Sequence, residues 1–310
     1  MSLRTPFAVR PNRALLRESV LVTAVLGALA LWRRVVHLVA DSLVPILDPL
    51  STVAAFVAGG VAAGGLFVAG VALLVRAYAA RRGVDAGFAL PTREDLRPLA
   101  LTAAVPVALV CVTALVGTAT GVPYGSLTRT HYGPSPSLVP LLATVGVHVA
   151  VLVPGLALVC QGVVQGSLRR VFDGPRAVVA TTLVAGFALT GGAGGLTAVP
   201  EAGKLAGAVV FVALLALTVH ASERIAREDL RPLASVPVAL FVALAVGSGL
   251  TEIDSLAGGL FALTHLAVLG VAAYGYDRSD SLLVPAFAYL CLSLSNAAVV
   301  VAEGGSAPPF

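Results

Sequence analysis

Charged side chains are scarce in this chain, where Asp, Glu, Lys and Arg make up 12% of 310 residues. Ordinary soluble domains are about 25% charged, so the composition excludes that class. Hydrophobic residues reach 58%, and the mean hydropathy is +0.95. Because a helix needs about 20 apolar residues to cross a membrane, we predict an all-α, polytopic integral membrane protein. It should be a bundle of about eight or nine transmembrane helices.

Cysteine and aromatic residues are also scarce. Cys111, Cys160 and Cys291 lie in apolar stretches, and none has a second cysteine at Cys-x-x-Cys spacing. This argues against disulfides or metal ligation, and we interpret all three as small buried hydrophobic residues. The arginines are spread over many loops without a basic stripe or an aromatic platform, so nucleic acid is not an expected partner.

Apolar stretches recur along the whole chain. We expect N-terminal membrane helices in 1–90, a core with extra C-terminal helices in 91–302 within the same membrane domain, and a short tail at 303–310. Arg17 and Glu18 lie near the start of the first span, and eight spans is the alternative count. The nine expected spans are 14–32, 50–75, 99–121, 138–164, 177–199, 205–220, 233–250, 256–274 and 282–302.

Basic residues are distributed unevenly between these stretches. Alternate hydrophilic segments hold 16 and 4 of the 20 Lys and Arg residues. The positive-inside rule therefore places the N-terminus, 76–97 and 224–231 in the cytoplasm and 124–136 outside a cell membrane. With nine spans the C-terminus lies outside. The net charge of +4 and the pI of about 9.2 then describe loops that face an anionic leaflet.

Few polar side chains lie inside the expected spans, and only the first span holds Asp, Glu, Lys or Arg near its middle. Intramembrane ionisable residues mark proton relays, ion pathways and catalytic centres, so their scarcity argues against a pump and a hydrolase. His148, His265 and Asn296 come closest to a metal-ligand set, but they lack a His-x-x-x-His spacing. We expect hydrogen-bonded packing or lumen lining from them, and no cofactor. The other polar residues are Gln161, Gln165 and, near an interface, His220.

The segment 154–172 carries the most specific pattern, Pro-Gly-Leu-Ala-Leu-Val-Cys-Gln-Gly-Val-Val-Gln followed by a basic turn. It resembles the first motif of the CPBP family of intramembrane proteases (CAAX-processing and bacteriocin-processing, or Abi), Gly-Pro-x-Glu-Glu-x-x-x-Arg-Gly-x-x-Gln. The family's Glu pair falls on Leu156 and Ala157, and its Arg falls on Gln161. Further along, Phe187 matches the Phe of the family's Phe-x-x-x-His motif, whereas Gly191 stands at its His.

The family's last motif, His-x-x-x-Asn or Asp, has two possible places. The region around His220 lies at the better distance from the earlier motifs, and the region 276–296 agrees better with the residues of the family's pattern. In the second alignment Leu292 takes the His position and Asn296 is the one retained residue. The segment from Phe261 to His265 also spells Phe-x-x-x-His, which we interpret as a coincidence because no Glu pair precedes it at the family's interval.

In this family the Glu pair is understood to activate water. Leu156 and Ala157 cannot accept a proton, and Gln161 has no useful basicity. The resemblance therefore implies a pseudo-protease with a CPBP-like scaffold that binds a membrane protein or a prenylated or lipidic ligand within the lipid bilayer. The alternatives are an active CAAX-like endopeptidase with an atypical site, and a small-molecule transporter or channel.

The resemblance also implies a geometry. The helix of Ala157 and Gln161 should pack on the helix of Phe187 and Gly191, because the family's Glu and His side chains converge on one water. Ala157 and Gln161 are four residues apart and share a helix face, which should point inward. The former site should be narrow and largely apolar, with Gln161 bonded to a neighbouring backbone group.

Two further patterns concern helix packing. Gly60 with Gly64, and Gly191 with Gly195, have the spacing that lets helix backbones approach closely. The sequence Arg-Glu-Asp-Leu-Arg-Pro-Leu-Ala occurs at 93–100 and again at 227–234, and Val-Pro-Val-Ala-Leu follows each copy. We interpret the repeat as a shared way of starting a helix; a duplicated transporter half is the alternative.

Overall fold

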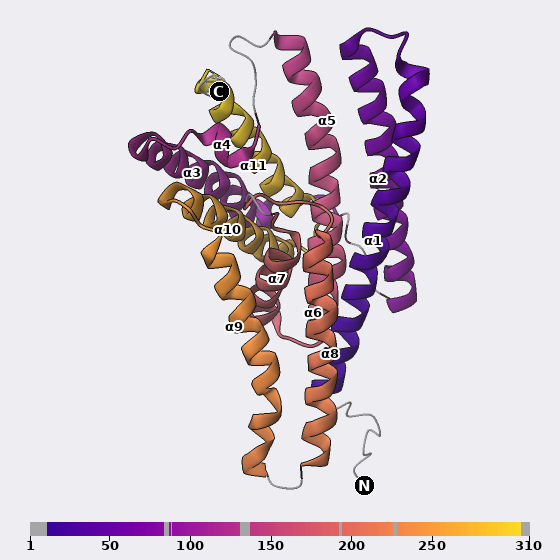
Figure 1. The fold of residues 1–310 in the computed structure, drawn as a ribbon, viewed down its shortest axis with the longest axis vertical. Coiled ribbons are helices and arrows are strands. Elements are labelled where there is room, and N and C mark those ends of the chain that lie inside the picture. The colour runs from indigo at the N-terminus through magenta and orange to yellow at the C-terminus, as the bar shows by residue number, and fades with distance from the viewer. Residues whose placement is uncertain are drawn as a thin grey trace.

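The computed structural model describes residues 11–83, 87, 89–130, 137–191, 194–225 and 228–304. In this part of the chain the regular secondary structure is helical, apart from one isolated bridge between Thr190 and Leu196. The elements, shown in Figure 1, are α1 Pro11–Leu47, α2 Thr52–Arg82, η1 Arg93–Asp95, α3 Leu96–Thr120, α4 Tyr124–Thr128, α5 Leu138–Leu156, η2 Ala157–Gln165, α6 Gly166–Leu168, α7 Gly174–Leu189, α8 Ala202–Arg224, η3 Glu228–Ser235, α9 Val236–Thr251, α10 Leu256–Ser279 and α11 Leu283–Ala302.

Eight helices of the described chain are long and apolar enough to cross a membrane. The prediction of an all-α polytopic membrane protein is thereby confirmed. α7 has 16 residues, about 24 Å at 1.5 Å per residue, which is shorter than the roughly 30 Å of hydrocarbon. The prediction of a fifth span over 177–199 is therefore wrong after Leu189, where the helix ends.

α7 ends at Leu189 because a glycine-rich segment follows, and glycine weakens a helix by about 1 kcal/mol per residue relative to alanine. The chain then forms a loop in which the Gly191 amide donates to the Gly195 carbonyl at 2.7 Å. The predicted helix contact of this glycine pair is therefore wrong. Leu196 and Val199 are buried in the loop, and irregular backbone is tolerated at membrane depth when protein surrounds it.

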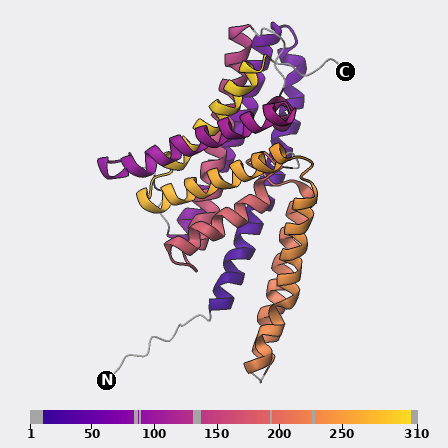
Figure 2. The same ribbon diagram turned by 90° about the vertical axis from the view of Figure 1, so that its left-hand side faces the viewer.

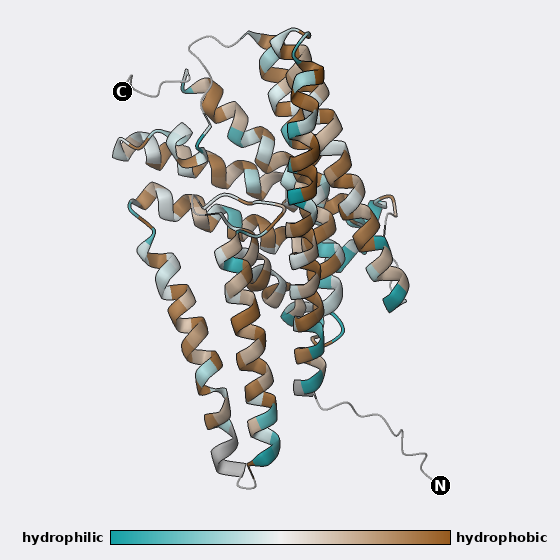
Figure 3. Cartoon of the chain, turned by 45° about the vertical axis from the view of Figure 1, so that its right-hand side comes forward, coloured by the Kyte–Doolittle hydropathy of each residue, from teal (hydrophilic) through white to brown (hydrophobic). Residues whose placement is uncertain are grey.

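The helices do not share one direction. α1, α2 and α5 run side by side, whereas α3, α7 and α10 cross them at steep angles (Figures 1 and 2). α8 and α9 form a hairpin that extends from the core, and no residue of α9 is buried. Figure 3 shows hydrophobic residues around the hairpin and hydrophilic ones near the ends of several helices. Such an apolar surface is typical of helices in contact with lipid.

Several helices carry charged residues near their ends. Basic residues lie near the N-terminal end of α1 and near the C-terminal ends of α2 and α8. An acidic residue directly follows the C-terminal end of each of α1, α9 and α11. This pattern agrees with the predicted orientation, which stays a prediction. Residues 1–10, 84–86, 88, 131–136 and 226–227 of the segments used for it lie outside the described residues.

α1 is longer than its expected span and carries a charge in its buried part. Glu18 is 5% exposed and forms an ion pair with Arg82 at the end of α2. A buried charge without a partner destabilises a protein strongly, so this pairing explains how α1 accommodates a carboxylate. Higher on the same helix, the Trp32 indole donates to the Phe67 carbonyl at 3.3 Å.

α2 and α5 approach each other closely at a pair of glycines. A Cβ atom added at Gly60 would lie 2.7 Å from Cγ1 of Val147, and one added at Gly64 would overlap Val151. The predicted role of Gly60 and Gly64 in helix packing is confirmed.

The two copies of the repeated sequence both contain 3₁₀ turns, but over different lengths. In the first copy η1 covers Arg93–Asp95 and α3 begins within the repeat, whereas in the described part of the second copy η3 covers Glu228–Ser235 and α9 begins only after it. Their surroundings differ, because α3 packs against α10 and α11 whereas α9 has no buried residue. Each copy leads into a long helix, which agrees with the interpretation of the repeat as a helix start, but the two helices begin at different positions of the repeat.

All three cysteines are free thiols. Cys160 is fully buried, but Cys111 is exposed on α3 and Cys291 is half-buried. The prediction of burial is wrong for Cys111, because its face of α3 points away from the core. A cysteine behaves there as a small apolar residue.

We predict that Gly64→Val destabilises the protein and that Gly65→Val does not. Both substitutions add the same side chain to α2, but position 64 faces Val151 whereas nothing lies within 4 Å of a Cβ atom at position 65. Overpacking of this kind costs about 1–3 kcal/mol. Thermal unfolding in detergent measures the difference, and equal midpoints for the two variants would contradict the α2–α5 contact.

Candidate functional site

A π-helical segment occupies the centre of the molecule. Ala157–Gln165 continues α5, but its hydrogen bonds run from residue i to i+5, and all nine residues are buried. Pro154 precedes the segment; proline lacks an amide hydrogen and disturbs the preceding turn. π-Helices are rare and often occur at functional sites.

Close contacts enclose this segment. A Cβ atom added at Gly155 would lie 3.0 Å from the Cβ of Ala198, and one added at Gly162 would lie 3.1 Å from Val75. α2, α7, α10 and α11 all pack against it. The expectation that Ala157 and Gln161 face inward on a helix that contacts α7 is confirmed.

Two glutamines of the segment bond to different helices. The Tyr289 hydroxyl on α11 lies 3.1 Å from Nε2 and 3.3 Å from Oε1 of Gln161. Gln165 donates from Nε2 to the Ala273 carbonyl of α10 at 2.8 Å. The prediction of a backbone partner for Gln161 is wrong, because the side chain of Gln161 bonds to the Tyr289 hydroxyl. Gln165 is the glutamine that bonds to a backbone carbonyl. Oε1 of Gln165 is buried without a hydrogen bond.

A cavity of about 290 Å³ begins where the π-helical segment starts. We call it the histidine cavity. α4, α5, α10, α11 and the loop after α7 line it, and Leu156 and Tyr289 contribute to its inner wall. Polar side chains in its lining include Thr144, His148, His265, Ser293 and Asn296.

Hydrogen bonds fix the orientation of two of these polar groups. Nδ1 of His265 lies 2.8 Å from the Phe261 carbonyl; since a carbonyl only accepts, Nδ1 carries the hydrogen and Nε2 is left as an acceptor. The Tyr124 hydroxyl donates to Oδ1 of Asn296 at 2.7 Å. Burial, and next the Glu303 carboxylate, raise the pKa of Tyr124, so this hydroxyl keeps its proton. The amide hydrogens of Asn296 are therefore free to bind another group.

The structure brings together only some of the residues that the sequence singled out. Leu156, His148, His265 and Asn296 line the histidine cavity, whereas Ala157 and Gln161 are buried behind its wall.

The second motif lies elsewhere. Phe187 is 38% exposed and packs at Gly207 of α8, and Gly191 lies beside Glu201. These two positions do not converge on Gln161. His220 lies on α8 near Arg13, in a separate groove.

The histidine cavity is lined by neutral groups. Among the described residues that line it, there is no carboxylate, lysine or arginine. Across the described chain, no group of three or more His, Cys, Asp or Glu side chains is placed to hold a metal ion. The arrangement can donate and accept hydrogen bonds, and it offers a histidine nitrogen as its strongest base.

Sequence reasoning missed Tyr124 and Tyr289, which orient Asn296 and Gln161. A signal was available for Tyr289, because a tyrosine in an apolar stretch needs a partner for its hydroxyl; Tyr124 lies in a segment that the sequence placed outside the membrane.

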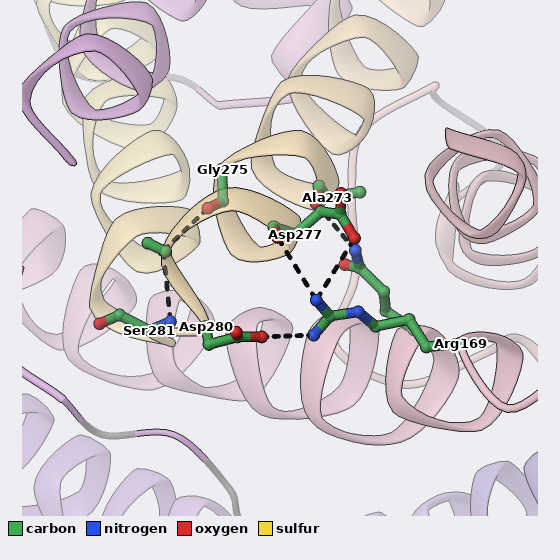
Figure 4. Close-up of polar contacts among 8 residues, drawn as sticks. Arg169, Ala273, Gly275, Asp277, Asp280 and Ser281 are labelled. Carbon is green, nitrogen blue, oxygen red and sulfur yellow. Dashed lines mark hydrogen bonds and ion pairs between the residues drawn. The ribbon is translucent and has the colours of Figure 1, made fainter. Parts of the chain in front are cut away.

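It also missed a charged cluster at the far end of the π-helical segment, shown in Figure 4. Arg169 bonds to Asp280 at 2.6 Å and to Asp277 at 3.3 Å, and its guanidinium lies 5.3 Å from the centre of the Tyr276 ring. This cluster ties the end of the segment to α10.

Comparisons with known proteins gave no match: no family model fits the chain, and no curated protein or solved structure is significantly similar to it. The resemblance to the CPBP family therefore rests on the motif residues alone.

We predict that Gln161 and Tyr289 are energetically coupled. A double-mutant cycle of Gln161→Leu and Tyr289→Phe should give a coupling energy of about 0.5–1.5 kcal/mol, the range of hydrogen bonds between membrane helices. Tyr78→Phe is the control partner, because the Tyr78 hydroxyl bonds to Ser167 and not to Gln161. Unfolding in mixed micelles provides the energies. Additive effects in the Gln161–Tyr289 cycle would contradict the buried bond.

Proposed function

We propose that this chain is a non-catalytic protein of the cell membrane, with its N-terminus in the cytoplasm, that binds an uncharged ligand in the histidine cavity. The observation that carries the proposal is the lining of that cavity, where neutral hydrogen-bonding groups face apolar walls and the described lining residues include no carboxylate. The ligand is lipidic, and a prenyl chain or the lipid-modified end of a membrane protein has the required chemistry.

The polar groups define which ligands fit. Nε2 of His265 accepts, the amide of Asn296 donates, and the Ser293 hydroxyl can do both. These groups complement an alcohol, ester or amide. An ion would be poorly solvated there, because no opposite charge lines the cavity. A volume of about 290 Å³ is at the lower end of ligand pockets, so the cavity holds a small ligand or one end of a longer one.

The absence of protease chemistry is part of the proposal. Hydrolysis needs a base within hydrogen-bond reach of the attacking water. Leu156 stands in the cavity wall where the resemblance places a glutamate, and Ala157 is buried behind it. The inward-facing first motif, packed against α7, supports a CPBP-like scaffold. The separate places of Phe187 and Gly191 give that scaffold no support.

A second candidate is passage of a small solute. It is favoured by a second cavity of about 490 Å³ at the other end of the π-helical segment, lined by Gly166, Arg169 and Tyr276. Leu156 and Gly166, which flank the segment, thus line separate cavities, as in transporters whose sites lie at irregular helix segments. Glycerol flux into proteoliposomes tests this candidate. Flux above that of empty liposomes would favour passage over binding.

We predict that farnesol, an uncharged prenyl alcohol, raises the unfolding midpoint of the purified protein. Leu156→Trp should abolish the shift by filling the cavity, whereas Leu217→Trp, on an exposed face of α8, should not. His265→Phe should weaken farnesol binding about tenfold, the effect of one lost hydrogen bond of about 1.4 kcal/mol. Binding of farnesane, the saturated hydrocarbon that has no hydroxyl group, should be the same in His265→Phe as in the wild type. A farnesol shift that survives in Leu156→Trp would exclude this cavity as the site.

We also predict that the purified protein, with or without added zinc, cleaves neither a prenylated nor a transmembrane peptide. The physical reason is that no carboxylate activates water in the cavity. Mass spectrometry of the peptides after incubation provides the measurement. Turnover that is abolished by a chelator or by Gln161→Ala would favour the active-protease alternative.

A further inference from the structure

A groove between α1 and α8 combines a basic end with apolar walls. It has a volume of about 520 Å³ and lies far from the histidine cavity in the fold, at the N-terminal end of α1. Its lining includes Arg13, Arg17 and Glu223 at the charged end and Val20, Leu21 and Ala216 along the apolar walls. We call it the α1–α8 groove.

The arginines of the groove differ in how they are paired. Arg13 uses Nε and Nη2 for a two-point ion pair with Glu223, at 2.6 and 2.7 Å, which leaves its Nη1 free of that carboxylate. Arg17, one turn further along α1, is exposed and makes no hydrogen bond or ion pair within the described part of the chain. With Glu223 counted, the charged residues in the groove have a net charge of +1.

Apart from His220 on α8, the rest of the groove is apolar. Val20 and Leu21 on α1 face Ala216 on α8, and the two helices run antiparallel, since Arg13 near the start of α1 meets Glu223 near the end of α8. From Arg13 to Leu21 the groove follows α1 for about 12 Å at 1.5 Å per residue. A cationic end followed by an apolar channel matches a molecule with an anionic head and a hydrocarbon chain.

We propose that the α1–α8 groove binds one anionic phospholipid, with its phosphate at Arg17 and Nη1 of Arg13 and an acyl chain along Val20, Leu21 and Ala216. Charge complementarity selects the head group, and basic pockets between membrane helices on the cytoplasmic side are known to bind anionic lipids. The groove lies at a basic helix end, which the positive-inside rule places at the anionic leaflet. This inference does not depend on the ligand of the histidine cavity.

Native mass spectrometry of the protein in detergent, with added phosphatidylglycerol or phosphatidylcholine, tests the proposal. Wild-type protein should retain one phosphatidylglycerol in preference to phosphatidylcholine. Arg17→Gln should reduce that retention about fivefold, corresponding to about 1 kcal/mol for one basic residue near a membrane surface. Ala216→Trp should reduce it by filling the apolar channel while it keeps both arginines. Arg176→Gln, at an exposed arginine whose side chain is 79% accessible outside the groove, should leave it unchanged.

Three results would overturn the proposal. The first is equal retention of the two lipids by wild-type protein, and the second is unchanged retention in Ala216→Trp. The third is displacement of phosphatidylglycerol by inorganic phosphate, because that would identify an anion site that does not use the apolar channel.

Discussion

The hydrogen-bonding requirement of the π-helical segment constrains the arrangement of the other helices. Hydrocarbon offers no partner to a polar group, so the side chains of Gln161 and Gln165 must be satisfied inside the protein. α11 supplies Tyr289 and α10 supplies the Ala273 carbonyl. The glycines at 155 and 162 let the neighbouring chain approach from the other sides. Because α10 crosses α5 steeply, Gln165 can bond to α10 while Gln161 bonds to α11.

The two ends of this segment have opposite chemistry. At one end Arg169 is held by Asp277 and Asp280, which fixes the segment against α10. At the other end Leu156 opens into a cavity of neutral polar groups. A rigid, charged anchor and a neutral cavity suit a protein that binds and holds a ligand. A hydrolase would need a proton acceptor where Leu156 stands.

Local composition predicted the class of fold, and residue spacing predicted one helix contact. Apolar length identified the spans except 177–199, where the glycines after Leu189 outweigh the apolar residues between them. The spacing of Gly60 and Gly64 predicted the α2–α5 contact, but the same spacing at Gly191 failed because position 191 is not helical. His148, His265 and Asn296 were recognised as polar residues in apolar spans. Their convergence on one cavity was beyond the sequence, because it depends on how α5, α10 and α11 cross.

The central claim is that a ligand can enter the histidine cavity while the π-helical segment beyond it is sealed. Cysteine accessibility in a variant that lacks Cys111, Cys160 and Cys291 tests it most directly. In intact proteoliposomes, a cysteine at Ser293 should react with a small impermeant thiol reagent added to the side that holds the acidic helix ends. A cysteine at Gln165 should react from neither side. Reaction at Gln165, or none at Ser293 with native fold retained, would contradict the account.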